Sequence, residues 1–149
     1  MNTKVLLLVI TLFSFTNRSV AQKNDQSSDK SEIEKVIKGY IENFFVNDYD
    51  KMEVFLHEKL SKRGVNQDGN LSKDYSKSDL KKLMESKPKF LLKHQYNKIT
   101  EVKVMNRIAT AVLETGYPKA RWTEYIHLAK LDGKWIILDV AWCFDKISG

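Results

Sequence analysis

The spacing of apolar residues divides the chain into a helical first part and a strand-forming second part. Apolar residues recur every three or four positions in the first part, which predicts an amphipathic helix. This stripe consists of Ile33, Val36, Ile37, Tyr40, Ile41, Phe44 and Phe45. Ser31 and Glu34 have the spacing of a capping box, so the first helix is predicted to start at Ser31.

Two shorter helices are predicted to follow. The polar residues 47–50 interrupt the first stripe, and a second helix bearing Met52, Phe55 and Leu56 is expected to end near Leu60. A glycine- and asparagine-containing loop is predicted at 62–73, with a short strand at 60–65 as an option. A third helix is predicted from a cap at Ser76 and stops before Pro88.

From Asn97 onward β-branched residues dominate, and the pattern predicts strands. Strands are expected at 97–104 and 108–114 around a turn at 105–107, then a loop at 115–120, then strands at 122–131 and 134–142. Asp132 and Gly133 join the last two strands and suit a type I′ turn. Helices followed by an antiparallel meander predict an α+β domain.

The N-terminus has the pattern of an export signal. Lys4 precedes an apolar run too short to span a bilayer as a helix, and Ser19 and Ala21 are the small residues expected before a cleavage site. We therefore predict a signal peptide at 1–21, a flexible tether at 22–30 and a single domain at 31–146. The mature protein is expected to be exported, either periplasmic or secreted, with no membrane attachment after cleavage.

Charge and cysteine content exclude several classes of protein. The whole chain has a formal net charge of +6, and the predicted signal removes Lys4 and Arg18 but no acid. The remaining lysines alternate with acids and form no basic patch, so no nucleic-acid partner is predicted. The single cysteine, Cys143, allows no intrachain disulfide and is expected to be buried. No histidine or cysteine spacing predicts a metal site, and no motif indicates a cofactor.

The order of elements, together with one sequence series, resembles the nuclear transport factor 2-like superfamily. The series is aromatic-x-acid-Tyr from Trp122, then Leu128-Ala129-Lys130, then Asp-Gly-Lys-Trp from Asp132. Within the superfamily the chain is similar to the group called putative lumazine-binding, which Phe55-Leu56-His57 also resembles. This resemblance implies a cone of three N-terminal helices packed on a curved antiparallel sheet, and often a homodimer formed through the sheets. The superfamily includes isomerases, dehydratases, cyclases and non-catalytic binders, so the fold does not select a function.

Strand pairing across Asp132-Gly133 gives two candidate faces. If the strands pair without interruption, Lys130 lies opposite Trp135, Ile126 opposite Asp139, and Glu124 opposite Ala141. We assign this face to the interior. The opposite face would carry Tyr125, His127, Ile136, Leu138, Val140 and Trp142, and we assign it to a partner subunit.

On the assumed interior face, Glu124 and Asp139 would be diagonal neighbours. Two carboxylates in an apolar pocket shift each other's pKa values apart, which general acid–base catalysis requires. Tyr40 would supply a hydroxyl, as in the acid-plus-Tyr oxyanion site of ketosteroid isomerase on the same fold. The candidate catalytic residues are therefore Glu124, Asp139 and Tyr40.

Three functions are consistent with the sequence. The first is a non-catalytic domain that binds a small apolar or aromatic molecule inside the cone. The second is a proton-shuttling isomerase or hydratase that uses the paired carboxylates, and the third is an interaction protein that docks through its sheet face. The predicted ligand-binding residues are Tyr40, Phe44, Phe55, His57, Trp122, Glu124 and Asp139.

Overall fold

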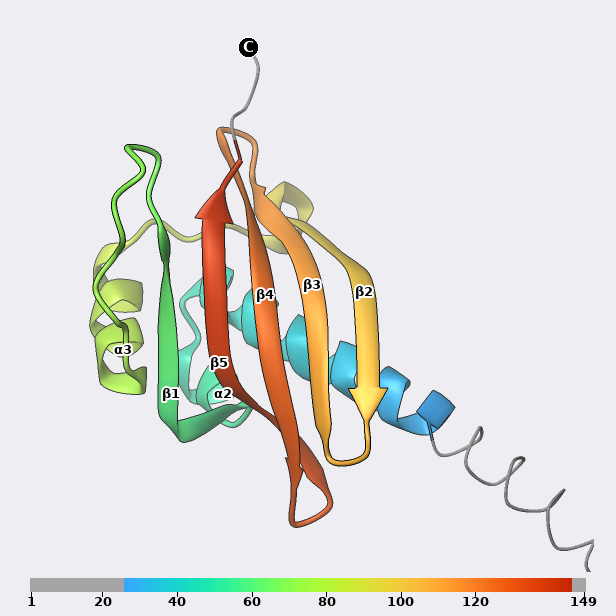
Figure 1. Cartoon of the computed structure of the whole chain (residues 1–149). Helices are drawn as coiled ribbons and strands as arrows, with labels where there is room; N and C mark the ends of the chain where they lie inside the picture. Colours follow the sequence, from blue (N-terminus) through green and yellow to red (C-terminus); the bar gives the residue numbers. More distant parts are fainter. Residues whose placement is uncertain (1–25, 146–149) are drawn as a thin grey trace, which may run out of the picture.

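A long helix crosses one face of a five-stranded sheet in the computed structural model, which describes residues 26–145 (Figure 1). This helix covers residues 26–46 of the described part. It is followed by α2 (Tyr49–Glu53), α3 (Lys77–Ser86) and the short 3₁₀ helix η1 (Leu92–His94). In Figure 1 the long helix lies behind the sheet, α3 lies beside the β1 edge, and the described part of the chain places no helix over the opposite face.

The strands are β1 (Leu56–Val65), β2 (Tyr96–Met105), β3 (Ile108–Tyr117), β4 (Ala120–Leu131) and β5 (Lys134–Phe144), arranged in the order β1-β5-β4-β3-β2. The last four strands form the predicted antiparallel meander. A wholly antiparallel sheet is nevertheless wrong, because β1 pairs with β5 in parallel. This strand enters the sheet from α2 rather than through a hairpin, so its direction is not set by a tight turn.

The apolar stripe of the long helix is confirmed as core. Ile33, Ile37, Tyr40, Ile41 and Phe45 are each at most 1% exposed and belong to the same cluster as the inward side chains of β3, β4 and β5. Stripe residues on one helical face therefore fix the helix against the sheet.

The predicted helix start at Ser31 and the tether at 22–30 are wrong for residues 26–30, which are helical. Asp29 explains the difference, because its carboxylate is buried and accepts hydrogen bonds from Lys130 Nζ at 2.6 Å and Trp135 Nε1 at 2.9 Å. Asp29 lies in a stretch of polar residues, but its buried hydrogen-bond partners are distant in sequence. The predicted signal peptide at 1–21 lies outside the described residues.

The predicted second helix is too long. It ends at Glu53, and Leu56 begins the ten-residue strand β1, in which Leu56, Leu60 and Lys62 are buried. An apolar pair at Phe55 and Leu56 fits either period, and pairing with β5 selects the strand. The third helix is confirmed, with a capping box between Ser76 and Asp79.

Both predicted hairpin turns are confirmed. In the first turn, Asn106 has a φ of 55°. In the second turn, Asp132 and Gly133 have φ values of 48° and 78°, the two positive values that a type I′ turn requires. The predicted loop at 115–120 is wrong, because β3 continues to Tyr117 and β4 begins at Ala120. Only Pro118 and Lys119 remain as the turn.

A β-bulge interrupts the register between β4 and β5. Lys130 pairs with Trp135 and Leu128 with Ile137, as predicted, but His127 then pairs with Asp139, which leaves Leu138 unpaired. Beyond this point Ile126 pairs with Val140, and Glu124 pairs with Trp142. The pairings predicted for Ile126 and Glu124 are therefore wrong, because an extra residue shifts every later side chain to the other face.

The bulge changes which side chains face outward. Val140 is fully buried, whereas Ala141 and Cys143 are exposed. Val140 and Trp142 thus do not belong to the outer apolar face, and the expectation of a buried Cys143 is wrong. A homodimer formed through the sheet would therefore have to use other exposed residues, among them Tyr125, which is 58% exposed.

Replacing Asp29 with Asn is predicted to destabilise the fold by about 1–3 kcal/mol, because the charge that faces Lys130 is lost. Burial raises the pKa of Asp29, but the hydrogen bonds from Lys130 and Trp135 and the Lys130 charge outweigh it, and the net pKa is lowered. The stabilisation is therefore present above the unfolded-state pKa of about 4 and is lost as the pH falls through the lower folded-state pKa.

Urea unfolding across the acid range checks this prediction. Asp132→Asn serves as the control, because it removes one exposed carboxylate from a turn where Asn is equally suited. Equal unfolding free energies for the two variants at pH 7 would contradict it.

Candidate functional site

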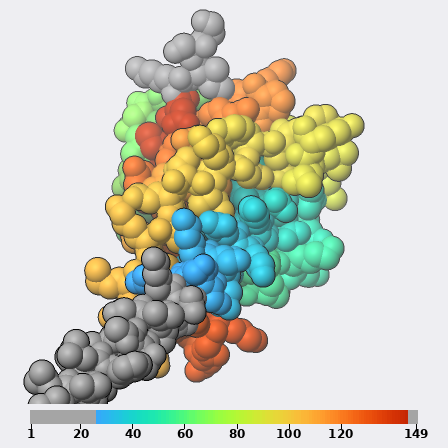
Figure 2. Space-filling model, turned by 90° about the vertical axis from the view of Figure 1, so that its right-hand side faces the viewer, coloured from blue at the N-terminus to red at the C-terminus, as the bar shows by residue number. Residues whose placement is uncertain are grey.

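A cavity of about 340 Å³ lies between the C-terminal end of the long helix, the sheet, and the segment that follows α3. Figure 1 shows this segment passing across the helix-covered side of the sheet from the β1 edge toward β2, and Figure 2 shows it in yellow above the long helix. The amide of Phe90 donates to the carbonyl of Phe45 at 2.9 Å, which attaches the segment to the helix. The lining residues are Phe44, Phe45, Lys62, Asn66, Tyr75, Leu80, Leu83, Lys87, Pro88, Phe90, Tyr117, Trp122, Glu124, Trp142 and Phe144.

Aromatic rings form much of the wall. The rings of Phe90 and Tyr117 stack with centroids 4.2 Å apart and planes within 9° of parallel. The Trp122 ring makes edge or tilted contacts with Phe45, Tyr117 and Phe144 at centroid distances of 5.7 to 6.1 Å. Flat apolar surfaces of this kind favour a planar apolar guest.

A buried ion pair lies at the polar side of the cavity. Lys62 Nζ on β1 donates to Glu124 Oε1 on β4, and the two side chains are 9% and 1% exposed. Trp122 Nε1 donates to the same oxygen at 3.0 Å, and the Tyr40 hydroxyl donates to Oε2 at 3.1 Å. Lys62 Nζ also donates to the Tyr40 oxygen at 2.6 Å. The Glu124 carboxylate is therefore held by three donors from three elements.

These contacts limit the chemistry of the site. Burial raises the pKa of Tyr40 well above its usual value, and the Glu124 charge and hydrogen bond raise it further, so the hydroxyl stays protonated. Three donors already occupy most of the acceptor positions of the Glu124 carboxylate. The cluster is thus suited to holding the strands and the helix together and to presenting a fixed polar surface.

Lys87 is a second cation of the cavity. It follows α3, and its Nζ lies 4.5 Å from the centre of the Phe44 ring and 3.4 Å from the carbonyl oxygen of Phe45. Burial lowers the pKa of Lys87 to about 8, with a smaller contribution from the charge of Lys89. Within residues 26–145, no carboxylate lies within ion-pair distance of Lys87.

The structure brings together some of the predicted ligand-binding residues. Phe44, Trp122 and Glu124 line the cavity. Tyr40 does not line it but donates a hydrogen bond to Glu124. Phe55 and His57 do not line it. The Phe55 ring packs against Gly39 so closely that a side chain there would overlap it, and His57 Nδ1 accepts from the amide of Lys59 at 3.2 Å.

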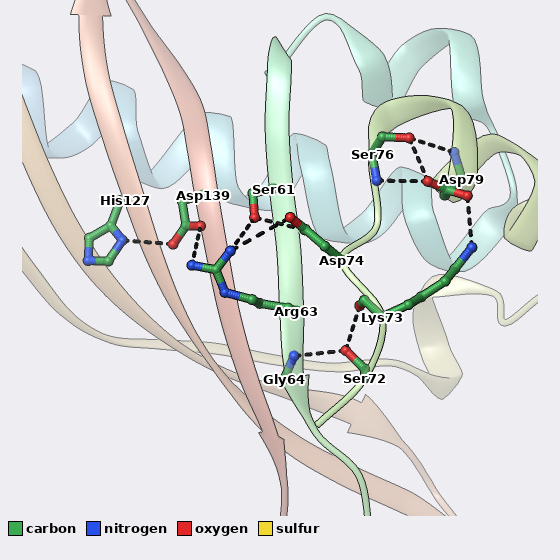
Figure 3. A network of polar contacts seen from close by, with 10 residues as sticks. All are labelled: Ser61, Arg63, Gly64, Ser72, Lys73, Asp74, Ser76, Asp79, His127 and Asp139. Carbon is green, nitrogen blue, oxygen red and sulfur yellow. Dashed lines mark hydrogen bonds and ion pairs between the residues drawn. The ribbon is translucent and has the colours of Figure 1, made fainter. Parts of the chain in front are cut away.

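Asp139 lies on the outer face of the sheet, so its predicted position beside Glu124 is wrong. Figure 3 shows it between His127, whose Nδ1 is 3.1 Å from Asp139 Oδ2, and Arg63, whose Nη2 is 3.9 Å from Oδ1. Arg63 continues the surface network to Ser61 and Asp74. The bulge at Leu138 causes this outcome, and it removes the carboxylate pair that the predicted acid–base mechanism requires.

Sequence reasoning did not identify Lys62, Lys87 or Phe90. The sequence holds a signal for Lys62, because Leu60, Lys62 and Gly64 alternate inward once residues 56–65 are assigned to a strand. The loop position of Lys87 and Phe90 gives no periodic signal.

Residues 26–145 contain no group of three or more His, Cys, Asp and Glu side chains arranged to hold a metal ion. Among the helices of that range, none has both the length and the apolar character needed to cross a bilayer.

The chain is similar to several proteins of known structure. An NTF2-like protein from Silicibacter pomeroyi, of unknown function, superposes with a TM-score of 0.73 at 18% identity, covering 80% of this chain and 98% of that one. An NTF2-like protein from Shewanella baltica, also of unknown function, gives a TM-score of 0.72 at 18% identity, with 81% and 97% covered. A ketosteroid isomerase-like protein from Erwinia carotovora gives 0.57 at 14%, with 78% and 96% covered. These similarities show the NTF2-like α+β fold.

A family model described as putative lumazine-binding matches residues 28–143. No curated protein matches the sequence.

Replacing Lys62 with Met is predicted to destabilise the fold by about 3–5 kcal/mol, because Glu124 would remain buried without its counter-charge. The double variant Lys62→Met, Glu124→Gln should lose less than the single variant, since neither charge remains. Urea unfolding of both variants measures the difference.

Lys59→Met is the matched control, since Lys59 is an exposed lysine on the same strand. Its unfolding free energy should change by less than about 0.5 kcal/mol. A double variant at least as unstable as Lys62→Met alone would contradict this prediction.

Proposed function

Because the chain belongs to the putative lumazine-binding family, we propose that it is a non-catalytic domain that binds a small aromatic molecule in the described cavity. The observation that carries this proposal is the cavity of about 340 Å³ walled by the Phe90–Tyr117 stack and Trp122. Its size is at the lower end of the range for small-molecule sites. The cavity lies between the long helix and the sheet, where the resemblance to NTF2-like proteins predicts the interior of a cone.

A binding role agrees with the state of the polar cluster. The Glu124 carboxylate is already held by Lys62, Trp122 and Tyr40. A satisfied buried cluster presents a rigid surface to a guest, and the guest need not replace any of its hydrogen bonds. The aromatic walls supply apolar contact area, which is the main source of affinity for a guest of this kind.

Two probes test the proposal by isothermal titration calorimetry. One is 2-naphthamide, a neutral planar amide, and the other is lumazine, chosen because of the family description. We expect saturable binding with one site per chain for at least one probe. Phe90→Ala should weaken that binding by about 1 kcal/mol, since half of the stacked pair is removed.

Leu92→Ala is the matched control, because Leu92 lies in the same segment, is 62% exposed and does not line the cavity. The absence of saturable binding by both probes at millimolar concentration would contradict the proposal. Equal losses of affinity in the two variants would place the site elsewhere.

We also propose that the protein is exported and forms a homodimer through the sheet. Export is supported by the signal-like pattern of residues 1–21. Dimerisation is supported by exposed apolar side chains of the sheet, among them Met105 at 70% and Ile108 at 59%.

Native mass spectrometry of protein purified from its own source checks both statements together. The expected species is a dimer of chains that begin at Gln22. A chain with Met1 retained would contradict export with cleavage, and a monomer at micromolar concentration would contradict the dimer.

A further inference from the structure

The charges that line the cavity do not balance. In the part of the chain that the structure describes, the lining residues with charged side chains are Lys62, Lys87 and Glu124. Lys62 and Glu124 form the buried ion pair and neutralise each other. Lys87 therefore leaves the cavity with an excess of one positive charge.

Among residues 26–145, none supplies an acid to the surroundings of Lys87. Within the described residues, its ammonium group donates to the carbonyl oxygens of Phe45 at 3.4 Å and Pro88 at 3.5 Å, both long contacts. The neighbouring charge that lowers the pKa of Lys87 is that of Lys89, another cation. An ammonium group that is half removed from water, with weak acceptors and a neighbouring cation, would be stabilised by an anion.

Lys87 also lies beside the aromatic wall. The carbonyl oxygen of Phe45 accepts from both the Phe90 amide and the Lys87 ammonium, so the two residues converge on one atom. The Phe90 ring stacks on Tyr117, and the Lys87 ammonium lies over the Phe44 ring. A planar ring near Phe90 would thus place a substituent within reach of Lys87.

We propose that the natural ligand is an aromatic carboxylate, with its ring against the Phe90–Tyr117 wall and its carboxylate paired with Lys87. This inference rests on the proposed function and specifies the chemical class of its ligand. A carboxylate accepts charge-assisted hydrogen bonds from an ammonium group, and partial burial strengthens that pairing. Lys62 remains paired with Glu124 and takes no part in holding the anion.

The test compares two probes of nearly equal size, 2-naphthoate and 2-naphthamide, which differ in charge. Isothermal titration calorimetry at pH 7 should show 2-naphthoate binding about tenfold more tightly than 2-naphthamide. Lys87→Gln should abolish this preference, chiefly by weakening the binding of 2-naphthoate. Lys87→Arg should retain part of the preference, because the charge is kept.

Lys89→Gln is the matched control. Lys89 is two positions from Lys87 and does not line the cavity. Removing its charge should therefore leave the preference for 2-naphthoate in place. Because its charge lowers the pKa of Lys87, this variant also raises that pKa. Thermal unfolding of all variants confirms that each is folded at the temperature of measurement.

The pH dependence gives a second readout on the unmodified protein. In the free protein Lys87 loses its proton as the pH rises through about 8, so the affinity for 2-naphthoate should fall above that pH. The affinity for 2-naphthamide should stay constant over the same range. The other titratable groups that face the cavity are Lys62, Glu124, Tyr75 and Tyr117, with Lys89 beyond its edge.

The outcomes separate the two proposals. If 2-naphthamide binds and 2-naphthoate binds no more tightly, the carboxylate assignment is overturned while the aromatic site stands. If the preference survives in Lys87→Gln, another cation holds the anion, and the assignment to Lys87 is overturned. If neither probe binds the unmodified protein, the proposed function fails and the ligand class fails with it.

Discussion

The arrangement of the site depends on the unpaired residue Leu138 between β4 and β5. A strand places successive side chains on opposite faces, so one extra residue exchanges the two faces for everything beyond it. Without the bulge, Asp139 and Ala141 would face the helix, and Val140 and Trp142 would face outward. With it, Val140 joins the core, Trp142 lines the cavity, and Asp139 joins a surface network with His127 and Arg63. The register shift thus adds Trp142 and Phe144 of β5 to an aromatic wall that other elements also supply.

The buried pair of Lys62 and Glu124 is the second constraint. It connects β1 to β4 across the intervening strand β5, and Tyr40 adds the long helix to the same cluster. Two charges in an apolar interior are costly unless each has its partner, so the cluster favours a single arrangement of these three elements. Gly64, two residues after Lys62, lets β1 approach β5 closely, because a side chain there would overlap the backbone and ring of Trp142. Close strand pairing and the ion pair therefore support one another.

Local patterns predicted much of the fold, and distant contacts account for the rest. The helical stripe around Tyr40, the Ser76 capping box and the Asp132-Gly133 turn depend on neighbours in sequence, and all three are confirmed. Asp29 and Leu56 were misassigned because their structure depends on Trp135 and on pairing with β5, each far away along the chain. The site was predicted only in part for the same reason. Phe44, Trp122 and Glu124 follow from periodicity, whereas the bulge that removes Asp139 has no marker in the sequence, since neither glycine nor proline occurs at residues 134–142.

The segment between α3 and β2 forms one wall of the cavity but contributes no strand to the sheet. Lys87, Pro88 and Phe90 all belong to it, while the remaining walls come from the helices, from the sheet and from the turn after β1. Loops accept insertions and substitutions at little cost to folding, because few buried contacts depend on them. This wall of the cavity is therefore separate in sequence from the strands that hold the buried ion pair. Substitutions in this segment would change one wall of the cavity while the sheet and its ion pair stay intact.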